Sequence, residues 1–205
     1  HHSMSTRTAS TRLVATPISP GPYLTVPNAI TVARTAVAVT LGFLAVTQQD
    51  ASLLAAAYAS YWVGDILDGW TARRLDQETR AGAVLDIVCD RACTAVACCA
   101  LVTVLPEAAP VVTAFFLSFM VLDTMLSFAF LLWPVRSPNY FYVIDRAIWL
   151  ANWSPAAKAI NTSGVVIALV LQLYALALAL TLIVAVVKVW SLRRLVPLLV
   201  RTPRT

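Results

Sequence analysis

Four aspartates at the ends of two neighbouring apolar stretches are the residues best suited to do chemistry. Asp65 and Asp68 lie three residues apart near the end of one stretch, and Asp86 and Asp90 lie four apart near the start of the next. In a helix, both spacings place the two side chains on one face. Because only the short segment 74–81 joins the two predicted helices, they run antiparallel, and all four carboxylates converge at one level.

Carboxylates this close together raise one another's pKa unless protons or cations compensate their charge. An all-oxygen ligand set without histidine or cysteine favours Mg²⁺, Mn²⁺ or Ca²⁺ over zinc. Two such ions could share bridging aspartates and hold a diphosphate. The alternative is an acidic patch neutralised by Arg73, Arg74 and Arg80, although exposed ion pairs rarely need four aspartates at the ends of two helices.

Small residues accompany the aspartates. Gly69 follows Asp68, Ala72 comes three residues later, and Gly82 begins the second stretch. Such residues allow close helix packing, which is common in membranes, but they also leave room for a flat ligand such as a nucleotide base or ribose. Arg73, with its fork of donors, is then placed to reach phosphates.

The complete pattern resembles the signature of a known family. It reads Asp65-x2-Asp68-Gly69-x2-Ala72-Arg73-x8-Gly82-x3-Asp86-x3-Asp90, which is similar at every fixed position to the motif of the CDP-alcohol phosphotransferases. The element that is usual upstream in this family is also present, as Pro27-Asn28-x2-Thr31-x2-Arg34.

The resemblance implies an enzyme that uses a CDP-linked lipid, usually CDP-diacylglycerol, and transfers its phosphatidyl group to an alcohol with release of CMP. It implies two Mg²⁺ or Mn²⁺ ions and, in this family, a homodimer. The residues it implies are the metal ligands Asp65, Asp68, Asp86 and Asp90, with Asp90 also the catalytic general base; Gly69, Ala72 and Gly82 at the cytidine; and Arg73, Thr31 and Asn28 at the diphosphate.

The acceptor alcohol is indicated less directly. The run Thr79-Arg80-x-Gly82-Ala83 and the pair Asp90-Arg91 resemble phosphatidylinositol and phosphatidylinositol-phosphate synthases of the family, so inositol or inositol phosphate is the first choice. A basic run that is usual in the inositol-phosphate enzymes is not found, so glycerol phosphate or phosphatidylglycerol stays as the alternative.

Two arginines are candidates for binding the acceptor. Arg91 is placed either to bind it or to pair with Asp90, and Arg136 either meets a phosphate or is an ordinary positive charge at the cytoplasmic face. Other charged residues are given structural roles: Asp145 and Arg146 as an ion pair within the bundle, Lys158 on the opposite side of the membrane, and Asp123 in a hydrogen bond between helices.

The composition indicates an integral membrane protein. Hydrophobic residues make up 60 % of the 205 residues and charged residues only 12 %, which excludes a soluble globule and a disordered chain. Nucleic acid is not an expected partner, because the net charge of +5 is not gathered on one amphipathic surface. The apolar stretches are of helix length, too long for barrel strands.

The predicted architecture is an all-α fold with six transmembrane helices. Strong spans are expected at 29–47, 52–72, 82–105, 108–133 and 163–189, and a weaker one at 140–158. Six spans place almost all Lys and Arg residues outside the spans on one side, so the positive-inside rule favours cytoplasmic termini. We therefore expect membrane lipids around the chain, a bacterial cell membrane as its location, and an active site facing the cytoplasm.

The domain organisation follows from these spans. Residues 1–3 are interpreted as a tag remnant, residues 4–26 as a cytoplasmic N-terminal arm, residues 27–190 as the six-helix catalytic domain and residues 191–205 as a basic cytoplasmic tail. The four cysteines, all on one stretch, are expected to be reduced packing residues.

Three other classes of protein are weighed. An intramembrane prenyltransferase also sets aspartates and Mg²⁺ against a diphosphate, but its two acidic motifs lie far apart in sequence. A divalent-cation transporter needs acidic residues along a path near the midplane, where only Asp123 is expected. A degenerate family member acting as a binding scaffold would not need the complete aspartate set.

Overall fold

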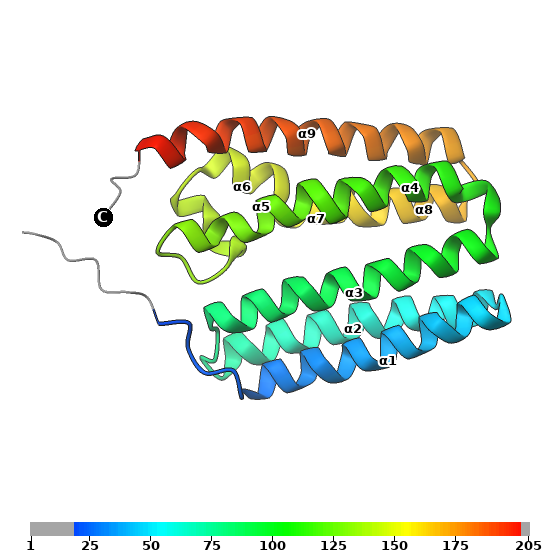
Figure 1. Ribbon diagram of the computed structural model, residues 1–205, viewed down its shortest axis with the longest axis horizontal. Helices are drawn as coiled ribbons and strands as arrows, with labels where there is room; N and C mark the ends of the chain where they lie inside the picture. The colour runs from blue at the N-terminus through cyan, green and yellow to red at the C-terminus, as the bar shows by residue number, and fades with distance from the viewer. Residues whose placement is uncertain (1–18, 202–205) are drawn as a thin grey trace, which may run out of the picture.

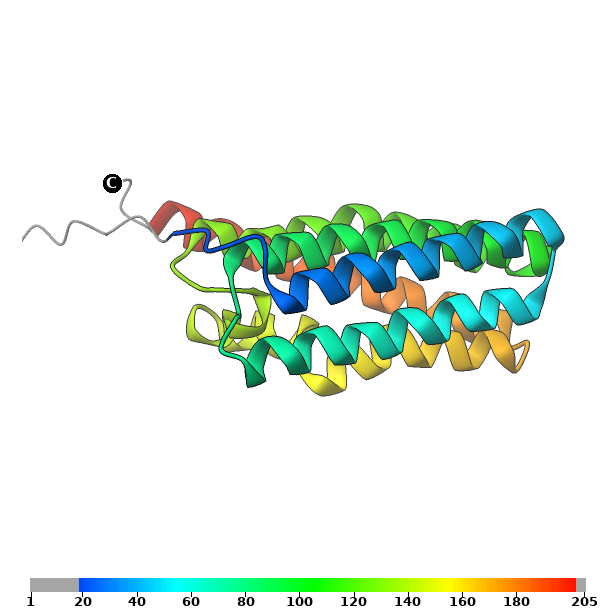
Figure 2. The same ribbon diagram turned by 90° about the horizontal axis from the view of Figure 1, so that it is seen from below.

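The computed structural model describes residues 19–201, except for the side chains of 162, 163, 200 and 201. The described part is helical throughout and contains no strand. Its long helices run along one axis (Figures 1 and 2). In chain order the elements are α1 (Val26–Gln48), α2 (Ala51–Arg74), α3 (Arg80–Val104), η1 (Pro106–Ala108), α4 (Ala109–Leu117), η2 (Ser118–Asp123), α5 (Thr124–Phe128), η3 (Ala129–Leu132), η4 (Pro138–Val143), α6 (Arg146–Asn152), α7 (Pro155–Lys158), η5 (Ala159–Gly164), α8 (Val165–Val170) and α9 (Tyr174–Arg201).

The first three helices begin at clear capping residues. Thr25, Asp50 and Thr79 each accept a hydrogen bond from a backbone N–H in the first turn of α1, α2 and α3 respectively, which satisfies a donor that the helix itself leaves free. α1 packs against both α2 and α3. Its contact with α2 is close at Gly64, where a Cβ atom would lie 2.4 Å from the Cβ of Arg34.

The second half of the chain is less regular. The segment from Pro106 to Leu132 is a continuous helical rod, but η2 within it is π-helical, and η5 (Ala159–Gly164) is a second π-helical segment. π-Helical turns widen a helix locally and often occur at functional sites. A buried aromatic cluster of Trp133, Phe141 and Trp153 packs at the end of the bundle where η3, η4 and α6 lie.

The predicted span at 163–189 is wrong as a single helix. A turn at Leu171–Leu173 divides it into the end of α8 and the start of α9, with Gln172 in the left-handed region at φ 57°. Every residue around this turn except Gln172 is apolar, so hydropathy alone does not detect it. The weaker span at 140–158 is likewise broken, into η4, α6 and α7.

Within residues 19–201, four helices are long and apolar enough to cross a membrane: α1, α3, the rod Pro106–Leu132, and α9 from Tyr174 to Leu199. The prediction of six spans is not confirmed by this count. α2 has 24 residues, or about 36 Å of helix, but its second half carries two aspartates and two arginines. Many large apolar side chains of these helices point outward, among them Val37, Phe43 and Ile183.

The described chain begins and ends at the same end of the bundle (Figure 1). α9 continues as a helix through Arg201, into the segment expected to be a basic tail. The predicted tag remnant 1–3 and most of the predicted N-terminal arm lie outside the described residues. The four cysteines are free, and three of them are buried, as expected for packing residues.

Candidate functional site

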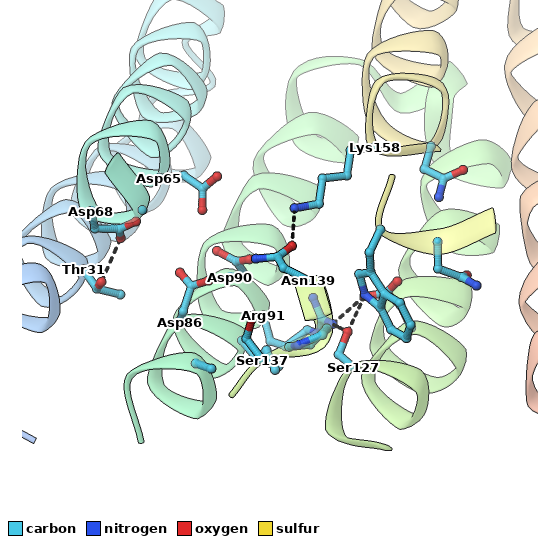
Figure 3. Close-up of a pocket in the computed structure, with 18 of the residues that line it drawn as sticks. Thr31, Asp65, Asp68, Asp86, Asp90, Arg91, Ser127, Ser137, Asn139 and Lys158 are labelled. Carbon is cyan, nitrogen blue, oxygen red and sulfur yellow. Dashed lines mark hydrogen bonds and ion pairs between the residues drawn. The ribbon is translucent and has the colours of Figure 1, made fainter. Parts of the chain in front are cut away.

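A cavity of about 540 Å³ opens at the end of the bundle where α1 and α3 begin and α2 ends. Figure 3 shows how the labelled side chains around it lie. All the residues predicted for the donor, the metals and the acceptor line this one cavity: Asn28, Thr31, Asp65, Asp68, Gly69, Ala72, Arg73, Gly82, Asp86, Asp90, Arg91 and Arg136. The structure therefore brings together the residues predicted for the donor, the metals and the acceptor.

The aspartates of α2 and α3 meet as their spacing predicts. One carboxylate oxygen each of Asp65, Asp68 and Asp86 lies within 4.8 Å of the others, and Asp90 lies one helical turn farther along α3. These donors are all oxygens of ionisable carboxylates, which suit a hard divalent cation such as Mg²⁺ or Mn²⁺. The donor set fits the divalent metal that the motif implies.

Arg34 of α1 contacts all four aspartates. Its Nη2 lies 2.5 Å from Asp86 Oδ1, 3.1 Å from Asp90 Oδ1 and 3.5 Å from Asp65 Oδ1. Its Nε donates to Asp68 Oδ2 at 2.8 Å. The counter-ion of the cluster is thus Arg34 and not the set of Arg73, Arg74 and Arg80 considered from the sequence.

The position of Arg34 explains why this contact is possible. Its side chain is only 3 % exposed, passes over Gly64 and places its guanidinium 5.3 Å from the centre of the Tyr61 ring. The Nη1 atom is buried and has no hydrogen-bond partner among the described residues. The sequence signal was an arginine inside an apolar span, which is costly in a membrane and marks a functional candidate.

The residues expected at the donor lie beside the aspartates. The Thr31 hydroxyl donates to Asp68 Oδ2 at 2.7 Å, and the Asn28 amide donates to the Tyr23 carbonyl at 2.7 Å. At Gly82 a Cβ atom would lie 2.8 Å from Asn28 Oδ1, so this glycine allows α3 to approach α1. Arg73 folds back over Gly69, where a Cβ atom would lie 3.4 Å from its Nη1.

The loop between α2 and α3 is tied to both halves of the site. The Gln77 side chain accepts a hydrogen bond from the backbone N–H of Val26 at the start of α1. The Tyr140 hydroxyl of η4 donates to the carboxylate of Glu78, and this hydrogen bond, together with partial burial, raises the pKa of Tyr140. The loop therefore joins the aspartate helices to the opposite side of the cavity.

A buried ion triad lies on that opposite side. Asp123, in the π-helical segment η2, pairs through one oxygen with Arg91 and through the other with Lys188 of α9, both at 2.5 Å. The guanidinium of Arg91 lies 3.8 Å from the centre of the Phe119 ring. Of the two alternatives for Arg91, pairing with Asp90 is therefore not found, and Asp123 holds two cations where the sequence suggested a hydrogen bond between helices.

Lys158 was expected on the far side of the membrane, but it lines the same cavity as the aspartates. The segment with α6 stays at this end of the bundle, and α7 begins the run towards the opposite end (Figure 1), which the charge pattern alone could not show. The ammonium of Lys158 donates to Asn139 Oδ1 at 3.0 Å (Figure 3). The exposed Arg136 lies 3.9 Å from Asp76.

The expected pair of Asp145 with Arg146 is also wrong. Asp145 begins α6 by accepting hydrogen bonds from the backbone N–H groups of Ala147 and Ile148, and it pairs with Arg194 of α9 at 2.8 Å. Partial burial acts to raise the pKa of Asp145, but these hydrogen bonds outweigh it and lower the pKa below its ordinary value. Asp145 therefore fixes α6 to α9 and takes no part in the cavity.

The fold and the site define a class of protein: a helical bundle with membrane-length helices, carrying at one end an acidic cluster that can hold a divalent metal beside an open polar cavity. A family model described as CDP-alcohol phosphatidyltransferase matches residues 24–192. The chain belongs to this family, whose members are phosphotransferases that transfer a phosphatidyl group from a CDP-alcohol to an acceptor. No curated protein and no solved structure was found to match the chain.

Proposed function

We propose that this chain transfers the phosphatidyl group of CDP-diacylglycerol to a small alcohol, with inositol or inositol phosphate as the acceptor and CMP as the second product. The observation that carries the proposal is the meeting of the complete aspartate motif with one polar cavity at the end of a membrane-length bundle. A lipid-linked nucleotide suits this position, because its acyl chains can lie among apolar helices while its head group reaches water.

In this proposal the metal ligands are Asp65, Asp68, Asp86 and Asp90, and the ions are two Mg²⁺ or Mn²⁺. Bound there, the metals would neutralise the diphosphate of the donor and stabilise the leaving CMP. The donor set supports this assignment, because all four side chains offer carboxylate oxygens and three of them already lie within 4.8 Å of one another.

The chain's own residues would bind and orient the donor. Arg73 and Thr31, with Asn28 nearby, hold the diphosphate, and the small residues Gly69, Ala72 and Gly82 leave room for the cytidine. All six line the cavity next to the aspartates. Arg73 is the one cation among them, so it would contribute most to neutralising the donor's charge.

Asp90 would act as general base. It lies farthest along α3 from the loop, and the cavity extends from it towards Arg91 and Lys158. In the reaction, Asp90 takes the proton of the acceptor hydroxyl, and the oxygen bonds to the phosphorus that carries the diacylglycerol. The bond from that phosphorus to the bridging oxygen of the diphosphate breaks, and CMP leaves with the electron pair.

We also propose six crossings of a bacterial cell membrane, with a cytoplasmic site and a homodimeric assembly. α2 and the segment Pro155–Val170 would supply the two crossings beyond the four apolar helices. The position of both ends of the described chain at one end of the bundle supports an even number of crossings (Figure 1). The dimer rests on the family resemblance.

The test is CMP release by the purified protein with CDP-diacylglycerol and Mn²⁺, with and without EDTA. The acceptors are inositol, inositol phosphate, glycerol phosphate, serine and phosphatidylglycerol. We expect metal-dependent release with inositol or inositol phosphate. Release only with glycerol phosphate or phosphatidylglycerol would keep the reaction and replace the acceptor, whereas failure of all acceptors would overturn the proposal.

A further inference from the structure

The side of the cavity that faces the aspartates is built mainly from the second half of the chain, beyond the aspartate motif. We call this side the polar wall. It carries side chains from η2, η4, α6, α7 and α9, and Figure 3 shows Ser137, Asn139 and Lys158 across the cavity from Asp65 and Asp68. The polar side chains of this wall that line the cavity include Ser118, Ser137, Asn139, Asn152, Lys158 and Lys188.

Three polar atoms of this wall are buried without a hydrogen-bond partner among the described residues. They are the hydroxyl oxygens of Ser118 and Ser137 and the Oδ1 atom of Asn152. Ser118 and Asn152 are more than nine-tenths buried. Asn152 is oriented by its own amide, which donates to Ser191 Oγ and to the Ile148 carbonyl, so its free carbonyl oxygen is held in place.

Buried polar atoms are nearly always paired, and exceptions commonly indicate a missing ligand or water. Here two hydroxyls and one carbonyl oxygen are left over in one cavity wall. A ligand with several hydroxyl groups can satisfy such a mixture, because each hydroxyl both donates and accepts. The orphaned atoms therefore favour a polyhydroxylated ligand over an apolar one.

The charges of the polar wall point to an anion as well. Arg91 and Lys188 share the single carboxylate of Asp123. Lys158 donates to the neutral Asn139 and forms no ion pair within 4.0 Å among the described residues. Counted with Arg91 of α3, three cations against one carboxylate leave two positive charges on this side of the cavity. The aspartates opposite have one cation, Arg34, against four carboxylates, and Lys158 also interacts electrostatically with Asp65. The two positive charges are therefore free for an anionic ligand once the proposed metals neutralise the aspartates.

A phosphate monoester carries a charge of about −1.5 to −2 at pH 7, which matches this excess. We propose that the polar wall is the acceptor subsite and that its acceptor is a phosphorylated polyol. The phosphate lies against Lys158 and the Arg91–Lys188 pair, and the ring or chain hydroxyls pair with Ser118, Ser137 and Asn152. One hydroxyl is then presented across the cavity to Asp90. This inference rests on the proposed function, because it selects among the acceptors of that reaction.

The experiment compares phosphorylated and unphosphorylated acceptors in matched pairs: inositol 1-phosphate with inositol, and glycerol 3-phosphate with glycerol. With CDP-diacylglycerol and Mn²⁺, we expect kcat/KM for at least one phosphorylated acceptor to exceed that of its unphosphorylated partner by about 100-fold or more. Equal use of both members of each pair, or preference for the free polyol, would overturn the assignment.

Variants locate the two parts of the subsite. Lys158→Gln should raise KM for the phosphorylated acceptor by about 10- to 100-fold, as expected for the loss of a charge-assisted hydrogen bond, and leave KM for the donor unchanged. The control is Arg146→Gln, which removes one positive charge from an exposed position outside the cavity and should change neither KM. An equal effect of both variants would show that only overall charge matters.

Ser118→Ala separates recognition from folding. Because Ser118 Oγ has no protein partner, its removal should leave the unfolding temperature unchanged or slightly higher while lowering kcat/KM for the acceptor several-fold. A lower unfolding temperature with unchanged acceptor KM would contradict the role of Ser118.

Ligand binding is measured as well, so that the subsite is tested apart from turnover. The shift in unfolding temperature is recorded with each of the four compounds in the presence of Mn²⁺ and without CDP-diacylglycerol. If no acceptor supports CMP release, the proposed reaction fails, but stabilisation by a phosphorylated polyol that is lost in Lys158→Gln still supports the subsite. Absence of any difference between phosphorylated and free polyols in this measurement overturns it.

Discussion

Removal of Arg34 should weaken the fold and at the same time increase its dependence on divalent metal. The guanidinium meets four carboxylates at 2.5 to 3.5 Å, and at an effective dielectric constant of about 20 each contact contributes roughly 5–7 kcal/mol of Coulomb attraction. Most of this is offset by the cost of desolvating the ions. Removing one partner of a buried pair nonetheless costs about 3–5 kcal/mol, because the opposite charge is left uncompensated.

For a protein of this size, that loss corresponds to a fall in unfolding temperature on the order of 10 °C. The substitution is Arg34→Gln, measured by thermal unfolding of the purified protein in EDTA and in Mn²⁺. Because a bound cation can replace the missing positive charge, Mn²⁺ should stabilise the variant more than the original protein, and its apparent Mn²⁺ affinity should rise.

The matched control is Arg74→Gln, which also removes an arginine from the same end of the bundle. Arg74 lies over the Trp70 ring and forms no ion pair among the described residues. We expect its unfolding temperature and its response to Mn²⁺ to stay close to those of the original protein. If Arg34→Gln is equally stable in EDTA, or gains no more from Mn²⁺ than the original protein does, Arg34 is not the counter-ion of the cluster.

Three further substitutions test separate parts of the site and the fold. Asp90→Asn should abolish CMP release while helical content and unfolding temperature stay close to normal, and retained activity would exclude Asp90 as the base. Arg73→Gln should weaken binding of CDP-diacylglycerol about tenfold or more and also lower the rate; unchanged donor affinity would remove Arg73 from the diphosphate. Gly64→Ala should destabilise the protein by about 1–3 kcal/mol in thermal unfolding, because its Cβ would lie 2.4 Å from that of Arg34. Gly164→Ala is the control, since the nearest atom there is 3.9 Å away, and equal stability of both glycine variants would contradict the close contact of α1 with α2.

The aspartate cluster could be predicted because it depends only on helix periodicity and one short loop. Asp65 and Asp68 share a face of α2, Asp86 and Asp90 share a face of α3, and the five residues between these helices leave them little freedom. Local spacing is therefore enough to predict that the four aspartates meet, whatever the rest of the fold.

Contacts between distant parts of the chain could not be read in this way. Arg34 lies 31 to 56 residues from the aspartates that it contacts, and Lys188 lies 65 residues from Asp123. Lys158 was misplaced because a broken segment, η4 to α7, was treated as one regular span. The turn at Gln172 was missed for a related reason: a left-handed residue between two apolar helices leaves no mark in hydropathy.

The two π-helical segments, η2 and η5, have a consequence for how this site can change over time. Each holds about one more residue than an α-helical turn, so deleting a single residue would convert the turn to ordinary α-helix and change which of its side chains face the cavity, while the helix on either side keeps its register. Ser118 and Asp123 in η2, and Asn161 in η5, all line the cavity. Small insertions and deletions in these segments would thus retune the second half of the cavity, whereas the fixed distance from Asp65 to Asp90 tolerates none. A lineage could in this way exchange one acceptor for another and inherit its phosphoryl-transfer machinery intact.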